Sequence, residues 1–327
     1  MLNQFRILLI FLTFTLLVNL APAQWDTVAV RGKQYVTANS LKNFYRFHTL
    51  SRQGKSATLE NSAIQMKIAA GSQECIMNRV KFILSDPVLE RSGRLLISRV
   101  DLTKLIDPVL RPNYIKGAGS FSTVILDPGH GGKDAGAVNQ YGTEAGYNLI
   151  VARKVRNILK SKGYNVVMTR DSDYYLSLQQ RVNLANRHPN AIFVSIHFNA
   201  GGRRQARGLE TFTLSPVGVA HYGRKVNSSD YNVRQGNYQD SANIALATAI
   251  HGRSLERTRS ANIPDRGIKR ARYSVLTGIK HPAILIEGGF LSHPQEARVI
   301  HSPSYQHSIS LGIAEGIMRY RAALSKH

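Results

Sequence analysis

The chain has 327 residues and a mass of 36.3 kDa, which is enough for two ordinary domains. Hydrophobic residues make up 43% and charged residues 19%, a globular composition that excludes wholesale disorder. The formal net charge of +23 indicates an anionic partner, such as nucleic acid, an acidic lipid surface or an acidic polymer. Cys75 is the single cysteine, so an intramolecular disulfide and a zinc site built from cysteines are both excluded.

The first 23 residues have the pattern of a cleaved signal peptide. Arg6 is followed by an apolar run over residues 7–17 and then by Ala21, Pro22 and Ala23. The run is too short to span a bilayer comfortably, and an A-x-A sequence is typical of a cleavage site. An uncleaved anchor and a buried N-terminal helix are the alternatives. We therefore expect export to the periplasm or cell envelope, with no stable membrane span after cleavage, which makes nucleic acid a poor partner.

Residues 24–115 are predicted to form a small α+β domain. Their apolar segments are short, as at 64–68, and turn signals separate them from helical stretches at 40–46 and 99–106. The stretch 111–120 contains one Pro, two Gly and no periodicity, so we expect it to be a linker.

Residues 121–324 are predicted to form an α/β domain. We expect strands at 124–126, 165–168, 191–196, 208–214, 273–276 and 283–286, and helices at 144–162, 177–187, 242–258 and 309–324. Continuous apolar strands separated by helices predict a mainly parallel sheet that is covered by helices on both faces. The polar stretch 215–240 lacks apolar periodicity and is expected to be a lid or a mobile loop.

Residues able to bind a metal lie at the ends of these strands, where open α/β sheets place their functional sites. His130 follows the first strand, and His197 and Glu287 directly follow two later strands, each with glycines beside it. Glu144 opens the helix after the first strand, and that helix start faces the same sheet edge. His, Glu and His from separate elements form the ligand set of a catalytic zinc with an open fourth position. Glu287 would then take a proton from the attacking water and deliver it to the leaving nitrogen.

Each of these residues also has a simpler interpretation. A lone histidine after a strand is more often a hydrogen-bonded surface residue, and Glu144 alone would be a helix-start carboxylate favoured by the helix dipole. Glu287 is costly at the end of an apolar strand, which already indicates function. The coincidence of four such residues at one predicted sheet edge favours a metal site.

Other polar residues are candidates for binding substrate. The basic segment 265–271 is expected either to line the cleft, with Arg266 or Lys269 binding a substrate carboxylate, or to be a solvated turn before the strand 273–276. Asn199, which follows the second metal-type histidine, is a third candidate. Four further histidines are expected to be solvated or capping residues: His188, His251, His281 and His293.

Seven segments of the second domain form an ordered set of motifs. They are ILDPGHGGKDAGAV, GTEAGYNL, GYNVVMTRDSD, SLQQRVNLAN, FVSIHFNA, DRGIKRARYSVL and ILIEGGFLSHPQEA. In this order they resemble the zinc-dependent N-acetylmuramoyl-L-alanine amidases of bacterial cell walls, over about residues 123–322. The resemblance implies that His130, Glu144 and His197 bind Zn²⁺, and that Glu287 is the catalytic carboxylate. It also implies hydrolysis of the amide between N-acetylmuramic acid and L-alanine in peptidoglycan, for cell-wall remodelling or daughter-cell separation.

Two features depart from the family pattern. Ala145 and Gly146 replace the charged pair that usually follows the helix-opening Glu. The stretch 215–240 is longer than the minimal pattern, and some family members carry a helix there that covers the zinc until a partner protein removes it. Three glycines in this stretch argue against a stable helix. We therefore expect a substrate-contacting loop, with an inhibitory cover as the alternative and the identity of any activator protein left open.

The first domain has a resemblance of its own. Residues 33–111, which end in LLISRVDLTKLIDPVL, are similar to the copper amine oxidase N-terminal-like modules that accompany secreted wall enzymes. The resemblance implies no copper site. It predicts a wall-binding or regulatory role for residues 24–115.

Three other functions were weighed against the amidase. A zinc peptidase acting on the stem peptides would use the same ligand set. A catalytically inactive wall-binding protein would need a broken ligand set, whereas all four positions are filled. A nucleic-acid binder is suggested by charge alone and is disfavoured by the predicted export and by the lack of a recognisable motif.

Overall fold

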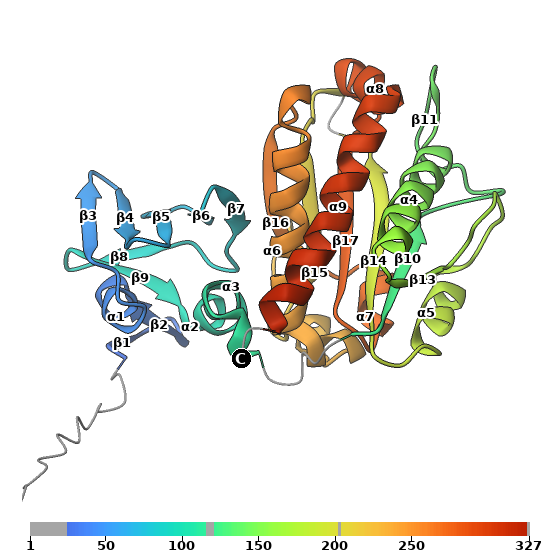
Figure 1. Cartoon of the computed structure of the whole chain (residues 1–327). Helices are drawn as coiled ribbons and strands as arrows, with labels where there is room; N and C mark the ends of the chain where they lie inside the picture. Colours follow the sequence, from blue (N-terminus) through green and yellow to red (C-terminus); the bar gives the residue numbers. More distant parts are fainter. Residues whose placement is uncertain (1–24, 116–120, 202–203, 326–327) are drawn as a thin grey trace, which may run out of the picture.

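A computed structural model describes residues 25–115, 121–201 and 204–325 (Figure 1). The predicted signal peptide at residues 1–23 lies outside these ranges, as does the second half of the predicted linker. Among the helices of the described ranges, none is both long and apolar enough to cross a membrane.

The first module consists of two antiparallel arrangements of strands with short helical segments between them. Its elements are β1 (Thr27–Val30), β2 (Lys33–Thr37), α1 (Ala38–Phe44), β3 (Thr49–Gln53), β4 (Ser56–Glu60), β5 (Gln65–Ala69), β6 (Glu74–Met77), β7 (Val80–Ile83), β8 (Leu89–Arg91), β9 (Arg94–Ser98), α2 (Arg99–Asp101), η1 (Leu102–Ile106), α3 (Asp107–Leu110) and η2 (Pro112–Tyr114). One sheet has the order β1-β2-β9-β8, and β3 to β7 form a meander. The predicted short strands and helices are therefore present.

The second module alternates strands and helices as the periodicity predicted. Its elements are β10 (Thr123–Pro128), β11 (Val138–Asn139), β12 (Gly142–Thr143), α4 (Glu144–Ser161), β13 (Asn165–Met168), α5 (Leu178–Asn186), β14 (Ala191–Asn199), β15 (Leu209–Leu214), η4 (Ser228–Tyr231), η5 (Gln235–Gln239), α6 (Asp240–Arg257), η6 (Arg259–Ala261), β16 (Asp265–Ala271), α7 (Ser274–Gly278), β17 (Ala283–Phe290), α8 (Pro294–His301) and α9 (Pro303–Leu324).

The sheet of this module places several strand ends at one edge. Strands β13, β10, β14 and β17 are neighbours in that order and run parallel. Strand β15 runs antiparallel to β17, and β16 runs parallel to β15. The carboxyl ends of β10, β14 and β17 therefore meet the amino ends of β15 and β16 at the same edge. The mainly parallel α/β sheet predicted from the sequence is confirmed.

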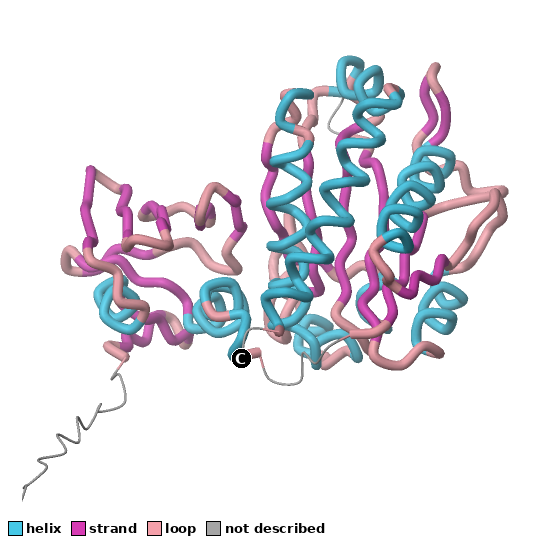
Figure 2. Tube along the Cα trace, viewed as in Figure 1, coloured by secondary structure: helices cyan, strands magenta, loops and turns pink. Residues whose placement is uncertain are grey.

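Helices cover both faces of this sheet. Figure 2 shows α4, α6 and α9 side by side along one face, where they share an apolar core with the strands. Helices α5 and α7 pack against the other face over a smaller core. Gly312 and Gly316 lie where α9 meets the backbone of α6 near Ser254 and Ile250, so a Cβ at either glycine would collide with α6.

The sheet does not end at the second module. Strand β7 pairs in parallel with β16 through Phe82 and Ile268, so the meander of the first module continues the sheet to eleven strands. The backbone N–H of Lys81 also donates to the Asp265 carboxylate at 3.0 Å. One apolar core contains residues of both modules. The division of the chain into domains at 24–115 and 121–324 stays a prediction.

Three local predictions differ from the structure. Residues 265–271 form strand β16, so the alternative of a solvated turn is wrong, and helix α7 stands where a strand was expected at 273–276. Charged side chains hid this strand, because burial of charge is tolerated only when tertiary partners neutralise it. His251 was expected to be solvated, but it is fully buried in α6 and hydrogen-bonds Thr211 and Asp265.

The polar stretch after β15 is ordered by ion pairs. Within the described residues 215–239 it forms two short 3₁₀ turns and no α-helix, as its glycines predicted. The buried Asp230 accepts hydrogen bonds from Arg224 and forms an ion pair with Arg272. His221 of this loop packs edge-on against Tyr273.

Candidate functional site

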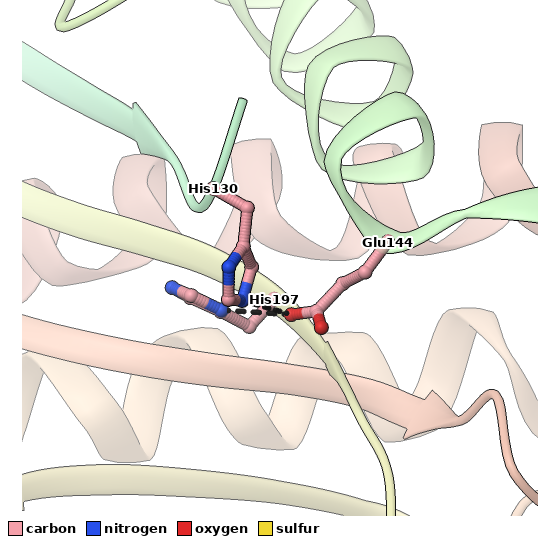
Figure 3. A group of neighbouring side chains, drawn as sticks. All are labelled: His130, Glu144 and His197. Atoms are coloured by element: carbon pink, nitrogen blue, oxygen red, sulfur yellow. Dashed lines mark hydrogen bonds and ion pairs between the residues drawn. The ribbon is translucent and has the colours of Figure 1, made fainter. Parts of the chain in front are cut away.

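The three predicted metal ligands lie together at the sheet edge (Figure 3). His130 follows β10, Glu144 begins α4, and His197 lies near the end of β14. Their ligand atoms all lie within 4.8 Å of one another. Oε1 of Glu144 lies 3.1 Å from Nε2 of His130 and 2.9 Å from Nδ1 of His197. One carboxylate oxygen therefore meets two imidazole nitrogens.

The glycines around these residues make this approach possible. A Cβ at Gly129 would overlap the His197 ring, and a Cβ at Gly136 would lie 2.6 Å from Oε2 of Glu144. Gly136 has φ +64°, and His130 itself has φ +60°, a left-handed conformation that is uncommon outside glycine. The glycine-rich segment after β10 is therefore required by the close packing of the three side chains.

Hydrogen bonds fix how the two ligands near this segment are oriented. Oδ2 of Asp134 lies 2.8 Å from Nδ1 of His130, which leaves the other ring nitrogen facing Glu144. The backbone N–H of Ala137 donates to Oε2 of Glu144 at 3.0 Å. The hydrogen bond to Glu144 raises the pKa of His130 against the effect of burial. Burial would raise the pKa of Glu144, but the hydrogen bonds from His130 and His197 hold it well below its usual value.

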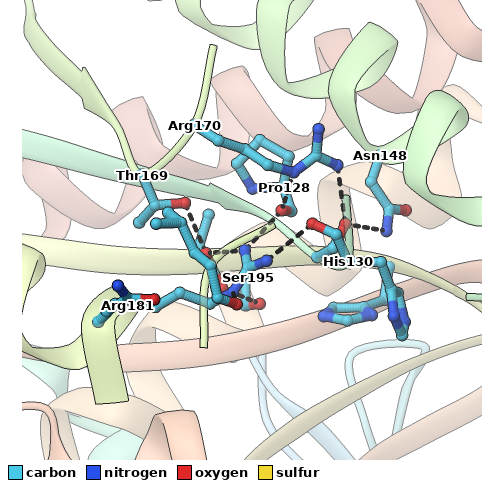
Figure 4. Close-up of polar contacts among 12 residues, drawn as sticks. Pro128, His130, Asn148, Thr169, Arg170, Arg181 and Ser195 are labelled. Carbon is cyan, nitrogen blue, oxygen red and sulfur yellow. Dashed lines mark hydrogen bonds and ion pairs between the residues drawn. The ribbon is translucent and has the colours of Figure 1, made fainter. Parts of the chain in front are cut away.

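Two buried arginines hold the backbone that carries His130 (Figure 4). Arg170 donates to the carbonyls of Pro128 and Gly129, and Arg181 donates to the carbonyls of Pro128 and His130. These contacts lock the turn after β10 in place. Sequence reasoning missed both arginines, although each lies within one of the family-like motifs.

An ion pair lies directly beneath this turn. Arg181 donates to the buried Asp127 carboxylate at 2.8 Å, and Thr169 and Ser195 donate to the same carboxylate. Burial alone would raise the pKa of Asp127. The Arg181 charge and these hydrogen bonds outweigh burial, so the pKa of Asp127 lies below its usual value.

Glu287 lies beside the metal-type cluster on the next strand. It is the cross-strand partner of His197, is 8% exposed, and its Oε2 has no hydrogen-bond partner among the described residues. Burial raises the pKa of Glu287 well above its usual value, and the charges of Glu144 and Glu210 act in the same direction. A carboxyl that is easily protonated and has one oxygen without a partner among the described residues is suited to exchanging protons with a bound molecule.

The three candidate substrate ligands share a different partner. Asn199 donates to Oε1 of Glu210 at 2.7 Å, and Arg266 and Lys269 both donate to Oε2. Glu210 and Lys269 are 3% and 2% exposed, so this ion pair is closed to solvent. Sequence reasoning missed Glu210, although a lone carboxylate in an apolar strand was the same signal that singled out Glu287.

A cleft of about 520 Å³ opens beside the metal-type cluster. Its walls include His130, Asp134, Tyr175, Leu178, His197, Arg272, Tyr273, Ser274 and Glu287. Asn199, Arg266, Lys269 and the loop 215–240 are absent from the described lining of this cleft. The loop borders it through His221, which packs against Tyr273, and through Asp230, which pairs with Arg272, and its substrate-contacting role stays a prediction.

The cluster has the donors that zinc prefers. Two imidazole nitrogens and one carboxylate oxygen converge from three separate elements, and both histidines are half-buried at the cleft rather than enclosed. Three protein ligands with access left for a water or substrate are the arrangement of catalytic zinc sites. The residues therefore fit such an ion.

Comparison with known proteins gives the same family as the motifs. Residues 124–319 match the family model for N-acetylmuramoyl-L-alanine amidase. The N-acetylmuramoyl-L-alanine amidase AmiA of Escherichia coli (strain K12) is 29% identical over 246 residues, which cover 68% of this chain and 84% of the relative.

Solved structures agree with this match. The catalytic domain of the amidase CwlV from Bacillus (Paenibacillus) polymyxa var. colistinus has a TM-score of 0.51 at 32% identity, over 61% of this chain and 98% of that domain. The CwlD amidase from Clostridioides difficile, solved in complex with the GerS lipoprotein, has a TM-score of 0.50 at 26% identity, over 62% of this chain and 98% of its own. Because the family model matches more than half of the chain, the protein belongs to the N-acetylmuramoyl-L-alanine amidase family and is an enzyme of that class.

Proposed function

We propose that the enzyme depends on zinc held by His130, Glu144 and His197, and that Glu287 is its catalytic carboxylate. The observation that carries this proposal is the convergence of the three ligand atoms beside a cleft that Glu287 also lines. The substrate is the amide between N-acetylmuramic acid and L-alanine in peptidoglycan, as in the amidase family.

The protein residues divide the chemistry between them. Zinc at this site would polarise the scissile carbonyl and lower the pKa of water. Asp134 holds the His130 ring so that its Nε2 faces the cluster, and Arg170 and Arg181 hold the backbone beneath it. Glu287 accepts a proton from the attacking water and returns it to the nitrogen of the leaving peptide. Its raised pKa suits a group that must both take and give a proton.

The charge of the chain fits an enzyme of the cell envelope. Residues 1–23 contain one basic residue, Arg6, and no acidic residue, so removal of this segment would leave the positive excess almost unchanged. A basic surface attracts the carboxylates of the stem peptides in a salt-dependent way. The lipoprotein bound to the related CwlD supports an accessory protein for this enzyme as well, and a role in wall remodelling or cell separation follows from the substrate.

Digestion of purified peptidoglycan by the zinc-loaded full chain tests the reaction. An amidase releases free stem peptides and leaves intact glycans, whereas a zinc peptidase leaves peptide remnants on the glycan, and mass analysis distinguishes the two. Products of the second kind would contradict the proposal. A catalytically inactive wall-binding protein would release neither product.

The variant Glu287→Gln tests the assignment of the catalytic carboxylate. We expect it to hold about one zinc per chain and to lose roughly 10²- to 10⁴-fold in turnover, the contribution of general acid–base catalysis. Glu256→Gln, at an exposed position of α6, is the matched control and should keep activity. Near-normal turnover of Glu287→Gln would remove this residue from the catalytic role.

A further inference from the structure

Two cavities lie next to each other where the first module meets helices α6 and α9. Helix α3 contacts α6 and the turn η2 contacts α9, and Figure 1 shows these segments together near the C-terminal end of α9. The two cavities share four lining residues: Val109, Thr248, Ala249 and Arg319. They therefore form one continuous depression, the junction groove, and none of its lining residues lines the cleft beside the metal-type cluster.

One end of the junction groove is apolar. This cavity has a volume of about 580 Å³, within the range of small-molecule sites. Prolines of the first module face alanines of α6 and α9 across it: Pro108, Pro112, Ala245, Ala249, Ala322 and Ala323. Arg319 is the only charged residue in its described lining. Small side chains on both helices leave this space unfilled, and it offers an apolar surface to a ligand.

The other end of the junction groove is positively charged. This cavity has a volume of about 1030 Å³, and three exposed arginines line it: Arg79, Arg259 and Arg319. None of the three has an ion-pair partner within the described part of the chain, whereas Arg253 in the same lining is paired with Glu256 and Glu315. Glu256 is the only acidic residue of the described lining. Like charges that share one groove repel each other, so an anion bound among them is stabilised.

The apolar end distinguishes between two classes of anionic ligand. A peptide carries a polar backbone, and its N–H and C=O groups would lose their hydrogen bonds to water in a cavity with few polar partners. An alkyl chain has no such groups and gains from leaving water. The apolar end therefore favours an amphiphile over an acidic peptide, and Arg319, which lines both cavities, marks where its head group would begin.

We propose that the junction groove binds a single-chain anionic amphiphile, with the alkyl chain in the apolar cavity and the anionic head among Arg79, Arg259 and Arg319. Guanidinium groups suit this head because they bind phosphate and carboxylate oxygens through paired hydrogen bonds. Both modules contribute to the lining, so a bound amphiphile stabilises their junction. The inference uses neither the zinc nor Glu287, so it does not depend on the proposed function.

Isothermal titration calorimetry of the full chain tests the ligand class. The probe is decyl phosphate, used below the concentration at which it forms micelles. Inorganic phosphate presents the head alone, decyl maltoside presents the chain with an uncharged head, and a triglutamate peptide presents negative charge on a peptide backbone. Decyl phosphate should bind at least about tenfold more tightly than each of the other three, because only it satisfies both ends of the groove.

Two variants test the location. Ala322→Trp places an indole in the apolar cavity from an exposed position of α9 and should weaken binding of decyl phosphate at least about tenfold. His307→Trp, at an exposed position of the same helix outside the lining, is its matched control. Arg319→Gln should weaken binding about threefold to tenfold through loss of one charged contact, with Arg298→Gln on α8 as its control.

Each contrary result overturns the inference in a different way. Equal binding of inorganic phosphate would mean that the groove recognises charge alone, and equal binding of decyl maltoside that it recognises the chain alone. Equal binding of triglutamate would assign the groove to an acidic peptide. If Ala322→Trp and Arg319→Gln bind decyl phosphate as wild type does, the amphiphile binds elsewhere. All four substitutions are at exposed positions, and the unfolding transition without probe checks that each variant is folded.

Discussion

Two carboxylates at the same sheet edge have opposite surroundings. Glu144 meets two imidazole nitrogens beside an open cleft, whereas Glu210 meets the cations of Lys269 and Arg266 in a buried cluster. Imidazoles bind metal ions in their neutral form, so the negative charge of Glu144 would serve a metal ion held by this cluster. The charge of Glu210 is already neutralised by Lys269 and Arg266. The first cluster therefore has the donors of a metal site, whereas the second holds β15 and β16 together.

The largest effect is expected where the metal-type cluster of His130, Glu144 and His197 loses a ligand. His197→Ala leaves two protein ligands, so bound zinc should fall from about one per chain to near zero and hydrolysis should fall by at least about 10³-fold. Metal analysis and peptidoglycan digestion measure the two quantities. His307→Ala, at an exposed position on α9, should change neither. If His197→Ala still binds one zinc per chain, the metal is held elsewhere and the contrast drawn between the two clusters is wrong.

Removing the charge of Glu210 should cost stability instead. Glu210→Gln leaves the buried Lys269 ammonium without its counter-charge, so the free energy of unfolding should fall by about 3–5 kcal/mol. Urea unfolding of the metal-free protein measures this loss. The pair of Arg253 and Glu256 is the control, because Glu256 is exposed and Glu256→Gln should cost under about 1 kcal/mol. An equally small loss for Glu210→Gln would mean that its cluster is solvated in solution.

A smaller effect on zinc binding is expected from Asp134, which contacts the metal-type cluster only through His130. Asp134→Asn keeps the size of the side chain but weakens its hold on the His130 ring, so zinc affinity should fall about 10- to 100-fold. Competition with a chelator measures the affinity. Asp171→Asn, at an exposed position, should leave it at the wild-type value. An unchanged affinity for Asp134→Asn would show that the turn backbone alone orients the ring.

The closed pair of Asp127 and Arg181 predicts a pH dependence. Because the pKa of Asp127 is lowered in the folded protein, its stabilisation is present above the ordinary carboxyl pKa and is lost as pH falls through the folded-state pKa. Asp127→Asn should cost about 1–3 kcal/mol at neutral pH and should flatten the loss of stability below about pH 4. Urea unfolding of the metal-free protein between pH 3 and 7 measures both. Parallel pH curves for variant and wild type would contradict the assignment.

The positions of the residues in the metal-type cluster could be predicted from the sequence, because each is marked by its place at the end of a strand or the start of a helix. His130, His197 and Glu287 each follow an apolar strand, and the carboxyl ends of parallel strands share one edge. The start of the next helix brings Glu144 to the same edge. The structure brings these four side chains together, while their chemical roles stay proposals to be tested by the variants above.

The closed clusters could not be predicted in the same way. Lys269 and Arg266 pair with Glu210 across more than fifty positions of sequence, so no local pattern links them. Their charges also made strand β16 unrecognisable, and the sequence left a cleft-lining segment and a solvated turn as the alternatives. Arg170 and Arg181 donate hydrogen bonds to backbone carbonyls. Every residue has a backbone carbonyl, so the sequence does not indicate which ones the arginines contact.

The high positive charge and the alternation of apolar strands with helices were determined by the sequence alone, because composition and periodicity depend on the residues and their near neighbours. Which charges are neutralised was decided only by tertiary structure, because pairing requires strands and helices from distant segments to meet. The same holds for the pairing of β7 with β16, which joins the two modules in one sheet.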